Sequence, residues 1–257
     1  MQLKDRICIV TGGSSGIGRG IALEFAREGA IVVIADIQES PIQGKYHQID
    51  VTTPTAKEIE KYCSKGIFIE TDVSDITQIE NMLKIVIEQF GRLDVLVNNA
   101  GIHIPGGSQD ISIADWDKVV GVNLRGVFMT TKLAIPFLKE SKYGRIIQIA
   151  SIHAFGGGAG PAYASAKAAV VNMVKDTALE VGKYSITVNA ICPGYIETAI
   201  QDYLTPEQVE SSLQKTPLQR LGLAKDIGRA AVFFASDDAE WITGASLIVD
   251  GGASAKS

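Results

Sequence analysis

The sequence predicts a single α/β domain in which helices cover both faces of a doubly wound parallel β-sheet. Three observations support this prediction. Short segments rich in valine and isoleucine alternate with helical stretches and are bounded by glycine, as in parallel strands that are buried on both sides. A glycine-rich turn separates the first strand from the first helix. No linker or low-complexity run divides the 257 residues, of which 46% are hydrophobic, so residues 1–257 are expected to share one core.

The expected strands are short apolar segments that recur along the whole chain, and they fall at residues 6–10, 31–35, 67–70, 93–97, 146–150, 186–192 and 246–249. The expected helices show apolar residues at helical spacing or begin with proline. They are residues 17–28, a helix that contains Asn123, residues 162–181, and a helix from Pro206 to about Gln214.

The turn after the first strand has the spacing Gly-x-x-x-Gly-x-Gly. Glycines let the backbone turn tightly and approach a ligand, and the helix that follows points its free amides at a pyrophosphate. Any tight strand-to-helix turn needs glycine, but this one opens the chain and is followed by a second strand. The sequence therefore predicts a Rossmann fold whose turn binds a dinucleotide through Gly12, Ser14, Ser15, Gly16, Ile17 and Gly18.

Asp36 ends the second expected strand, 18 residues after Gly18. A carboxylate at this position can accept hydrogen bonds from the adenosine ribose hydroxyls and would repel a 2′-phosphate. Neither the glycine turn nor the residues after the strand, Ile37 and Gln38, offer a cation for such a phosphate. The sequence therefore predicts NAD as the cofactor; the alternative is a solvated aspartate in a loop.

Tyr163 and Lys167 stand one helical turn apart and share a helix face. A nearby cation favours the tyrosinate, and a phenol tuned in this way can move a proton to or from a carbinol oxygen. Ser151 follows the expected strand 146–150, so its hydroxyl projects from the carboxyl end of that strand. A tyrosine and a lysine four residues apart also occur as an ordinary exposed pair on a helix. The surrounding motifs decide between this interpretation and a catalytic pair.

Further motifs follow in order along the chain, each after an expected strand or within an expected helix. They are Asn98-Asn99-Ala100-Gly101, Asn123, Pro193-Gly194, and Thr198, four residues past Gly194.

Together these motifs resemble those of the short-chain dehydrogenase/reductase family over nearly the whole chain. The resemblance implies a catalytic tetrad of Asn123, Ser151, Tyr163 and Lys167. In it Tyr163 acts as base or acid, Lys167 also holds the nicotinamide ribose, and Asn123 anchors a water that relays protons. Further cofactor contacts are implied for Asp72, Val73, Asn99, Ala100, Gly101, Tyr163, Pro193, Gly194, Ile196 and Thr198.

Two aspartates between Asp36 and Asn98 are candidates for contacting the adenine, because this stretch is longer than the family pattern. Asp72 is preferred since it lies 26 residues before Asn98, which leaves room for one helix and one short strand; Asp50 would leave 48. Residues 38–65 are then expected to form a surface excursion that is interrupted by Pro41, Gly44 and Pro54.

Residues 194–217 are expected to form a lid over the substrate. No arginine or lysine lies between Gly194 and Gln214, which disfavours anionic substrates unless Arg125, Arg145 or Lys215 approaches from elsewhere. The expected substrate is a neutral secondary alcohol, such as a sugar or polyol, or its ketone. Candidate substrate contacts are His103, His153, Tyr195, Ile200 and Tyr203.

Two other functions remain open. The segment from Pro193 through Gly222 resembles the 3-oxoacyl-acyl-carrier-protein reductases of the family, although those mostly resemble NADPH users with an arginine where this chain has Ser15. A protein that binds the dinucleotide without turnover is the more remote alternative, since all four tetrad positions are filled.

The composition restricts partners and location. A net charge of −5 without a basic cluster argues against nucleic acid or an anionic membrane as partners. Without an apolar run of 18 residues or a signal peptide, the protein is expected to be soluble and cytoplasmic. Cys8 and Cys192 are expected to be core thiols, and His47, His103 and His153 lack metal-ligand spacing.

The chain is also expected to form a homo-oligomer, most simply a tetramer. The helix 162–181 and the helix around Asn123 are apolar around most of their circumference, which one sheet cannot cover. Two such helices per subunit could pair about a two-fold axis. The family resemblance implies a second interface through the strand 246–249.

Overall fold

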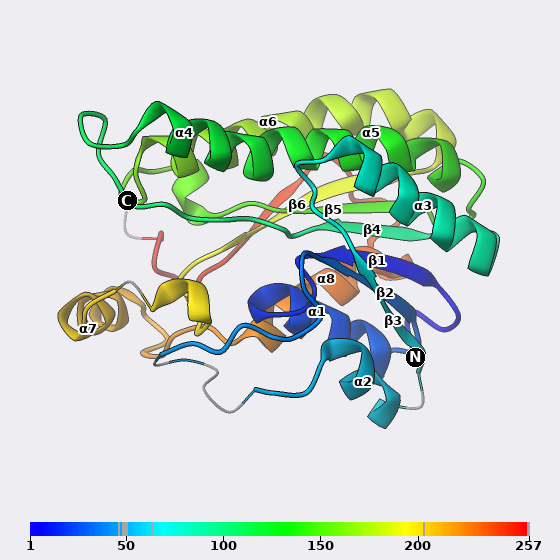
Figure 1. Cartoon of the computed structure of the whole chain (residues 1–257), viewed down its shortest axis with the longest axis horizontal. Coiled ribbons are helices and arrows are strands. Elements are labelled where there is room, and N and C mark those ends of the chain that lie inside the picture. The colour runs from blue at the N-terminus through cyan, green and yellow to red at the C-terminus, as the bar shows by residue number, and fades with distance from the viewer. Residues whose placement is uncertain (46, 48–50, 63, 203, 256–257) are drawn as a thin grey trace.

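The structure is a computed structural model and describes residues 1–45, 47, 51–62, 64–202 and 204–255. Seven parallel strands form one sheet in the order β3-β2-β1-β4-β5-β6-β7 (Figure 1). All seven coincide with expected segments to within two residues at each end. They are β1 Ile7–Thr11, β2 Ile31–Asp36, β3 Gly66–Glu70, β4 Val95–Asn98, β5 Arg145–Ile149, β6 Thr187–Pro193 and β7 Ser246–Val249.

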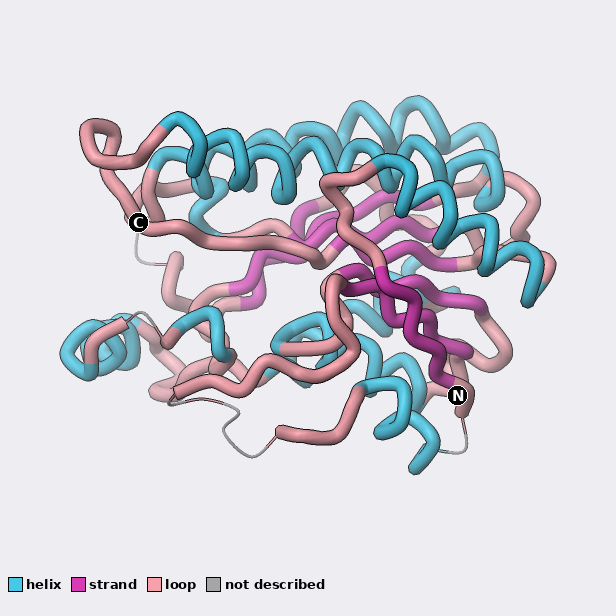
Figure 2. The backbone as a smooth tube through the Cα atoms, viewed as in Figure 1, coloured by secondary structure: helices cyan, strands magenta, loops and turns pink. Residues whose placement is uncertain are grey.

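Helices cover both faces of the sheet, which confirms the predicted single-domain Rossmann fold (Figures 1 and 2). On one face lie α3 Ile76–Phe90, α4 Ile113–Val120, α5 Val127–Leu138 and α6 Pro161–Val181. On the other lie α1 Gly16–Arg27, α2 Thr55–Ile59 and α8 Ala224–Ala235. The helix α7 Pro206–Lys215 stands apart, beyond the carboxyl ends of the strands. Among the described residues, no helix is long and apolar enough to span a membrane.

The strand order reverses between β1 and β4. From β1 the chain moves outward to β2 and β3, and then returns to place β4 on the other side of β1. In an open α/β sheet, such a reversal leaves a crevice at the carboxyl ends of the two central strands, and ligands bind there. Thr11 at the end of β1 and Asn98 at the end of β4 therefore mark the place to look for the site.

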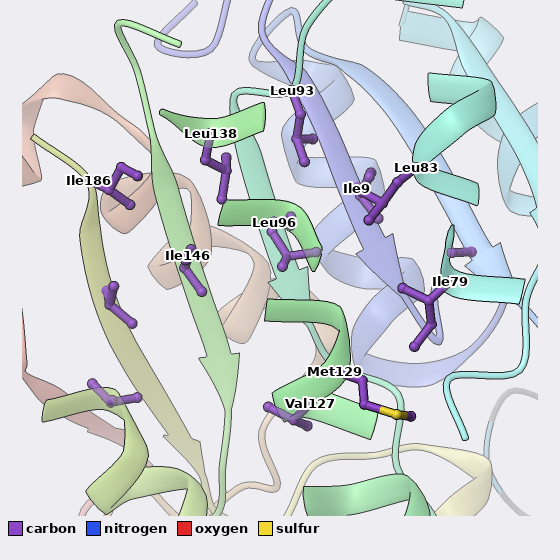
Figure 3. Packing of buried hydrophobic residues seen from close by; sticks show 14 of the residues in the cluster. Ile9, Ile79, Leu83, Leu93, Leu96, Val127, Met129, Leu138, Ile146 and Ile186 are labelled. Atoms are coloured by element: carbon purple, nitrogen blue, oxygen red, sulfur yellow. The ribbon is translucent and has the colours of Figure 1, made fainter. Parts of the chain in front are cut away.

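The core consists of two apolar layers, one on each face of the sheet. Figure 3 shows part of the layer beneath α3, α5 and α6, where Ile9, Leu96 and Ile146 from three strands meet Leu83 and Leu138 from two helices. These side chains are at most 2% exposed. The strands are apolar on both faces because both faces are covered, which explains their continuous rather than alternating Val/Ile pattern.

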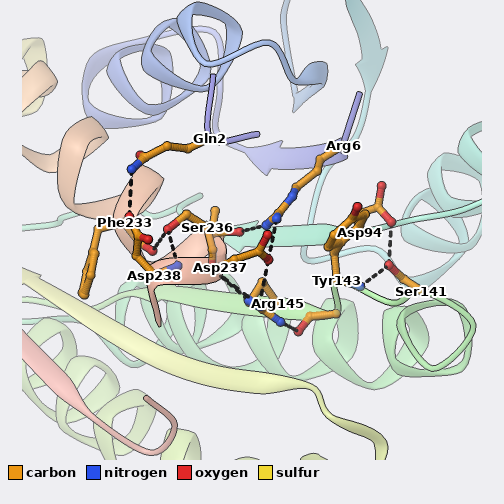
Figure 4. Close-up of polar contacts among 12 residues, drawn as sticks. Gln2, Arg6, Asp94, Ser141, Tyr143, Arg145, Phe233, Ser236, Asp237 and Asp238 are labelled. Carbon is orange, nitrogen blue, oxygen red and sulfur yellow. Dashed lines mark hydrogen bonds and ion pairs between the residues drawn. The ribbon is translucent and has the colours of Figure 1, made fainter. Parts of the chain in front are cut away.

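A polar network closes the opposite end of the sheet, where the strands begin (Figure 4). The buried guanidinium of Arg6 donates to Asp237 at 2.7 Å and stacks on the Tyr143 ring, with its central carbon 4.2 Å from the ring centroid. Arg145 lies within 3.7 Å of the same Asp237 carboxylate and donates to the Ser236 carbonyl oxygen. The positive charges of Arg6 and Arg145 are thus both paired with the carboxylate of Asp237.

The prediction that residues 38–65 form a surface excursion is wrong for residues 55–62. Residues 55–62 form α2 and a short 3₁₀ turn, Glu60–Tyr62, that cross from β2 to β3. Ile59 is fully buried in the core and Thr55 is almost so. Because α2 is only five residues long, its apolar pattern is too brief to be recognised as a helix.

Candidate active site

The turn after β1 packs so closely against the segment after β4 that Gly12 leaves no room for a side chain. Gly12 has φ of +64°, and a Cβ there would lie 2.8 Å from the Ala100 Cα and 2.9 Å from the side-chain nitrogen of Asn99. Among the described residues, no side chain caps the N-terminus of α1, and its first turn holds no acidic residue. The glycine turn therefore leaves helix amides available to an anion, which fits the pyrophosphate of a dinucleotide.

Thr11 joins this turn to the segment after β4. Its hydroxyl oxygen accepts from the backbone amides of Asn99 and Ala100, at 3.0 and 3.1 Å. In return, the side-chain amide of Asn99 donates to the carbonyl oxygens of Thr11 and Gly12, at 2.9 and 3.1 Å. Thr11 was not among the residues expected from the sequence. The only signal for it was its position directly before the glycine turn, which does not reveal a contact across 88 residues.

Asp36 ends β2 beside the glycine turn. One carboxylate oxygen accepts from the Ser14 amide at 3.0 Å, and the other accepts from the Ile37 amide at 2.8 Å. The Ser14 hydroxyl donates to the Gln38 carbonyl oxygen at 2.7 Å. Burial raises the pKa of Asp36, and the backbone hydrogen bonds oppose the rise. Within the described residues, Asp36 forms no ion pair.

The basic residue nearest the turn in sequence, Arg19, points away toward α2. Its guanidinium donates to the Thr53 carbonyl oxygen at 2.8 Å and to the Thr55 hydroxyl at 2.9 Å, and it lies 4.0 Å from Glu58. Burial lowers the pKa of Arg19. These contacts hold α2 in place, and they direct the Arg19 guanidinium away from the glycine turn.

Asp72 follows β3 on the same side of the sheet as Asp36. The Thr71 amide donates to the Asp36 carbonyl oxygen at 2.8 Å, so the two strand ends lie together. One Asp72 oxygen accepts from the amide and hydroxyl of Ser74, at 2.8 and 2.7 Å. Val73 is buried against Gly126. The competing candidate, Asp50, lies outside the described residues.

Lys167 and Tyr163 lie on one face of α6, over the end of β5. Lys167 is buried, and its ammonium nitrogen donates to the Ile149 carbonyl oxygen at 2.7 Å. The same nitrogen lies 5.7 Å from the centroid of the Tyr163 ring. Burial lowers the pKa of Lys167 from 10.5 to about 8. The site therefore contains a cation that the protein makes easier to deprotonate, next to a phenol.

Ser151 and Asn123 are positioned by local backbone. The Ser151 hydroxyl oxygen accepts from the His153 amide at 3.2 Å, at the start of a 3₁₀ turn that follows β5. Asn123 is fully buried in a π-helical turn, Gly121–Gly126, and its side chain bonds both backbone groups of Ile102, each at 2.8 Å. A Cβ on Gly101 would lie 3.4 Å from the Asn123 oxygen and 3.7 Å from the Lys167 nitrogen, so these side chains share one small space.

The segment after β6 returns to the glycine turn. The Cβ position of Gly194 is blocked by Asp250, and Ile196 is buried and bridges to Gly222. The methyl group of Thr198 would lie 3.4 Å from a Cβ on Gly16, whose φ is +54°. Thr198, in the segment that was expected to form the lid, therefore lies directly against the glycine turn.

The candidate substrate residues separate into three groups. The His103 ring lies edge-on to Tyr163, with centroids 5.3 Å apart, and its Nε2 donates to the Ala159 carbonyl oxygen at 3.0 Å. His153 and Tyr195 are 6.4 Å apart between ring centroids. Ile200 is exposed, and Tyr203 lies outside the described residues.

Arg125, Arg145 and Lys215 are the basic residues that the sequence analysis considered as contacts for an anionic substrate. The structure places them in different parts of the fold. Arg145 cannot reach the site, because it begins β5 and belongs to the network at the opposite end of the sheet. Arg125 donates to the Ser74 carbonyl oxygen at 3.1 Å. Lys215 ends α7 and is exposed.

The comparisons with known proteins agree with this geometry. A family profile described as "Enoyl-(Acyl carrier protein) reductase" matches residues 12–254. The chain is 37% identical to (2S)-[(R)-hydroxy(phenyl)methyl]succinyl-CoA dehydrogenase subunit BbsD of Thauera aromatica, over 99% of this chain and 98% of that protein. It is 35% identical to 3-oxoacyl-[acyl-carrier-protein] reductase FabG of Thermotoga maritima, over 98% of this chain and 99% of that protein.

It is also 34% identical to meso-2,3-butanediol dehydrogenase of Serratia marcescens, over 99% of this chain and 97% of that protein. Among solved structures, levodione reductase matches with a TM-score of 0.89 and 31% identity, over 99% of this chain and 100% of that chain. The fold, the site motifs and these similarities agree: the chain belongs to the short-chain dehydrogenase/reductase family of oxidoreductases, which bind a nicotinamide dinucleotide.

Proposed function

We propose that this protein is an NAD(H)-dependent dehydrogenase that interconverts a neutral secondary alcohol, such as a diol or sugar, and its ketone. The observation that carries the proposal is the grouping of Lys167, Tyr163 and Ser151 at the carboxyl end of β5, with the Lys167 ammonium held at 2.7 Å from the Ile149 carbonyl oxygen. A phenol and a hydroxyl then face one substrate oxygen, backed by a buried cation.

Each member of this group has a distinct role. Tyr163 accepts the carbinol proton in oxidation and returns it in reduction. The positive charge of Lys167 favours the tyrosinate, and the Ser151 hydroxyl orients the substrate oxygen without ionising. When bound, the nicotinamide supplies or accepts the hydride. Asn123 keeps the segment after β4 against the site through its two bonds to Ile102, and we assign the water-anchoring role to it.

The preference for NAD(H) is inferred from Asp36. Its carboxylate is already held by the Ser14 and Ile37 amides, so it is oriented before any ribose arrives. Arg19, the basic residue that follows the turn, is bonded to Thr53 and Thr55 instead. A 2′-phosphate would meet a carboxylate, and the repulsion is worth roughly 1–4 kcal/mol at intermediate dielectric. The residues proposed to hold the remainder of the dinucleotide are Gly12, Ser14, Ser15, Gly16, Ile17, Gly18, Asp72, Val73, Asn99, Ala100, Gly101, Pro193, Gly194, Ile196 and Thr198.

The substrate class is inferred from the lid and from the relatives. Residues 194–217 are proposed to close over the substrate, and their lack of arginine and lysine before Lys215 favours an uncharged molecule. His103, beside Tyr163, and the pair His153 and Tyr195 are proposed polar contacts for further hydroxyl groups. The name of the Serratia marcescens relative, a butanediol dehydrogenase, points in the same direction.

The second candidate function is reduction of a 3-oxoacyl thioester. It is favoured by the similarity to the Thermotoga maritima reductase and by the description of the matching family. The carboxylate of Asp36 argues for NADH rather than NADPH in that case as well.

Two further properties belong to the proposal. A homotetramer is inferred from exposed apolar side chains on α5, α6 and next to β7, such as Phe128, Leu179 and Trp241. A cytoplasmic location is inferred from the free buried thiols of Cys8 and Cys192, which suit a reducing compartment.

The test is a screen for NAD⁺ reduction over small diols, sugars, cyclic alcohols and steroids, with 3-oxoacyl thioesters assayed in reverse with NADH. The proposal expects turnover with one or more neutral alcohols and at least tenfold weaker turnover with NADP⁺. Activity confined to the thioesters would replace it with the second candidate.

A further inference from the structure

The segment that follows β2 reaches across to the lid. Figure 1 shows this blue segment running toward the yellow segment that precedes α7. Gly44 packs against the 3₁₀ turn Ala199–Gln201, since a Cβ on Gly44 would lie 3.2 Å from the Ala199 Cα and overlap the Asp202 carboxylate. The two segments are more than 150 residues apart in sequence. We call residues 42–45 and 47 the latch segment.

Asp202 receives two bonds from the latch segment. The Nδ1 of His47 donates to one carboxylate oxygen at 2.6 Å, and the Lys45 amide donates to the other. The side chains of His47 and Asp202 are only 16% and 13% exposed. A hydrogen bond to a charged acceptor that is largely shielded from water contributes more than an exposed ion pair. This contact is therefore strong enough to bias the position of the lid.

The other end of the latch segment is tied to the glycine turn. The Ile42 amide donates to the Ser15 hydroxyl oxygen at 2.6 Å. Thr198, four residues before Asp202, has its methyl group against Gly16. The start of α1, where the cofactor pyrophosphate is expected, thus touches the latch segment through Ser15 and the lid through Gly16.

We propose that His47 and Asp202 are positioning residues that hold the first part of the lid over the bound dinucleotide. This proposal rests on the assignment of residues 194–217 as the lid. The latch segment, the glycine turn and residues 198–202 form a closed ring of contacts at the start of α1, where the diphosphate is expected, and the pair His47–Asp202 closes it. Release of the dinucleotide requires the ring to open, so the pair controls the rate of cofactor release.

The experiment measures release of NADH from the binary complex by stopped-flow fluorescence, without any substrate. His47→Ala and Asp202→Ala should each speed release roughly tenfold. The double variant should release NADH no faster than Asp202→Ala alone, because that single change already removes the contact with His47 together with the bond from the Lys45 amide. His47→Gln, which keeps a side-chain donor, should recover much of the effect. Lys57→Ala, an exposed change on α2, is the matched control.

KM and kcat provide the second readout. The alanine variants should raise KM for NADH while kcat stays equal or rises, whereas damage to the site would lower kcat. Thermal unfolding identifies any variant that fails to fold, and His47→Gln then carries the test. Unchanged release in the single variants, or additive effects in the double variant, would overturn the proposal. Failure of the substrate assignment would appear in the alcohol screen and leave these release rates as expected.

Discussion

The ammonium nitrogen of Lys167 donates a hydrogen bond to the carbonyl oxygen of Ile149 across 2.7 Å. Ile149 is the last residue of β5, two residues before Ser151, so one bond ties the helix that carries Tyr163 to the strand that directly precedes the serine. The position of the cation relative to both hydroxyl groups is thereby set by the framework. The predictions below depend on that framework and on the residues around it.

Tyr163→Phe is expected to lower kcat by roughly 10²–10⁴-fold, since the ring remains and only the proton-transferring hydroxyl is lost. Binding of NADH should be unchanged within about twofold, because the phenol is not needed to shape the glycine turn. Steady-state kinetics and a fluorescence titration check the two parts. Near-normal turnover would exclude the proposed mechanism.

The rate of alcohol oxidation is expected to depend on the pair Lys167 and Tyr163. Burial lowers the pKa of Lys167 to about 8, so its ammonium charge is lost as the pH rises through that value. This charge favours the tyrosinate that accepts the carbinol proton. The kcat/KM for oxidation should therefore fall as the pH rises above about 8. Lys167→Met should lower the rate below pH 8 and remove this fall; an unchanged profile would contradict the role of Lys167.

Asp36→Asn is expected to weaken the preference for NAD(H) over NADP(H) by about tenfold or more. The amide oxygen can still accept from the Ser14 amide, while the bond from the Ile37 amide is lost together with the negative charge. The ratio of kcat/KM for the two cofactors is the measurement. Asp72→Asn serves as the comparison, because a change at the adenine end should affect both cofactors alike and leave their ratio unchanged.

Thr11→Val is expected to lower the free energy of unfolding by about 1–3 kcal/mol. The substitution preserves the shape of the side chain but removes the acceptor for the amides of Asn99 and Ala100. Thr11→Ser keeps the hydroxyl and should lose far less. Denaturant unfolding of the two variants is the measurement, and equal losses would show that the hydroxyl is not the cause.

The assembly is expected to dissociate when its apolar surfaces are charged. Leu179 on α6 is 84% exposed and Trp241, close to the edge strand β7, is 96% exposed. Leu179→Glu and Trp241→Glu should each reduce a tetramer to a dimer, and the double variant should be monomeric. Light scattering at micromolar concentration measures the mass. Ile76→Glu, on α3, is the control, and a wild-type monomer would contradict the prediction.

Local patterns in the sequence were sufficient for the strands, the glycine turn and the helices α1, α6 and α7. Each of these depends on neighbouring residues: apolar runs form buried strands, glycine permits positive φ, and a spacing of four places Tyr163 and Lys167 on one helix face. The resemblance of the motifs then pointed to the family, and the comparisons confirm it. The short helix α2 was missed, because five residues hold too little periodicity. The helix α8 was also not among the expected helices.

Only the tertiary structure decided which distant residues meet. Thr11 bonds Asn99 and Ala100 because β4 returns beside β1, and Arg145 is removed from the site because it begins a strand whose other end holds the proposed catalytic residues. The contact between His47 and Asp202 depends on the paths of two long connections. Strand order and the paths of connections follow from the packing of all the elements at once, so no local pattern contains them. The low pKa of Lys167 has the same origin, since burial is a property of the whole fold.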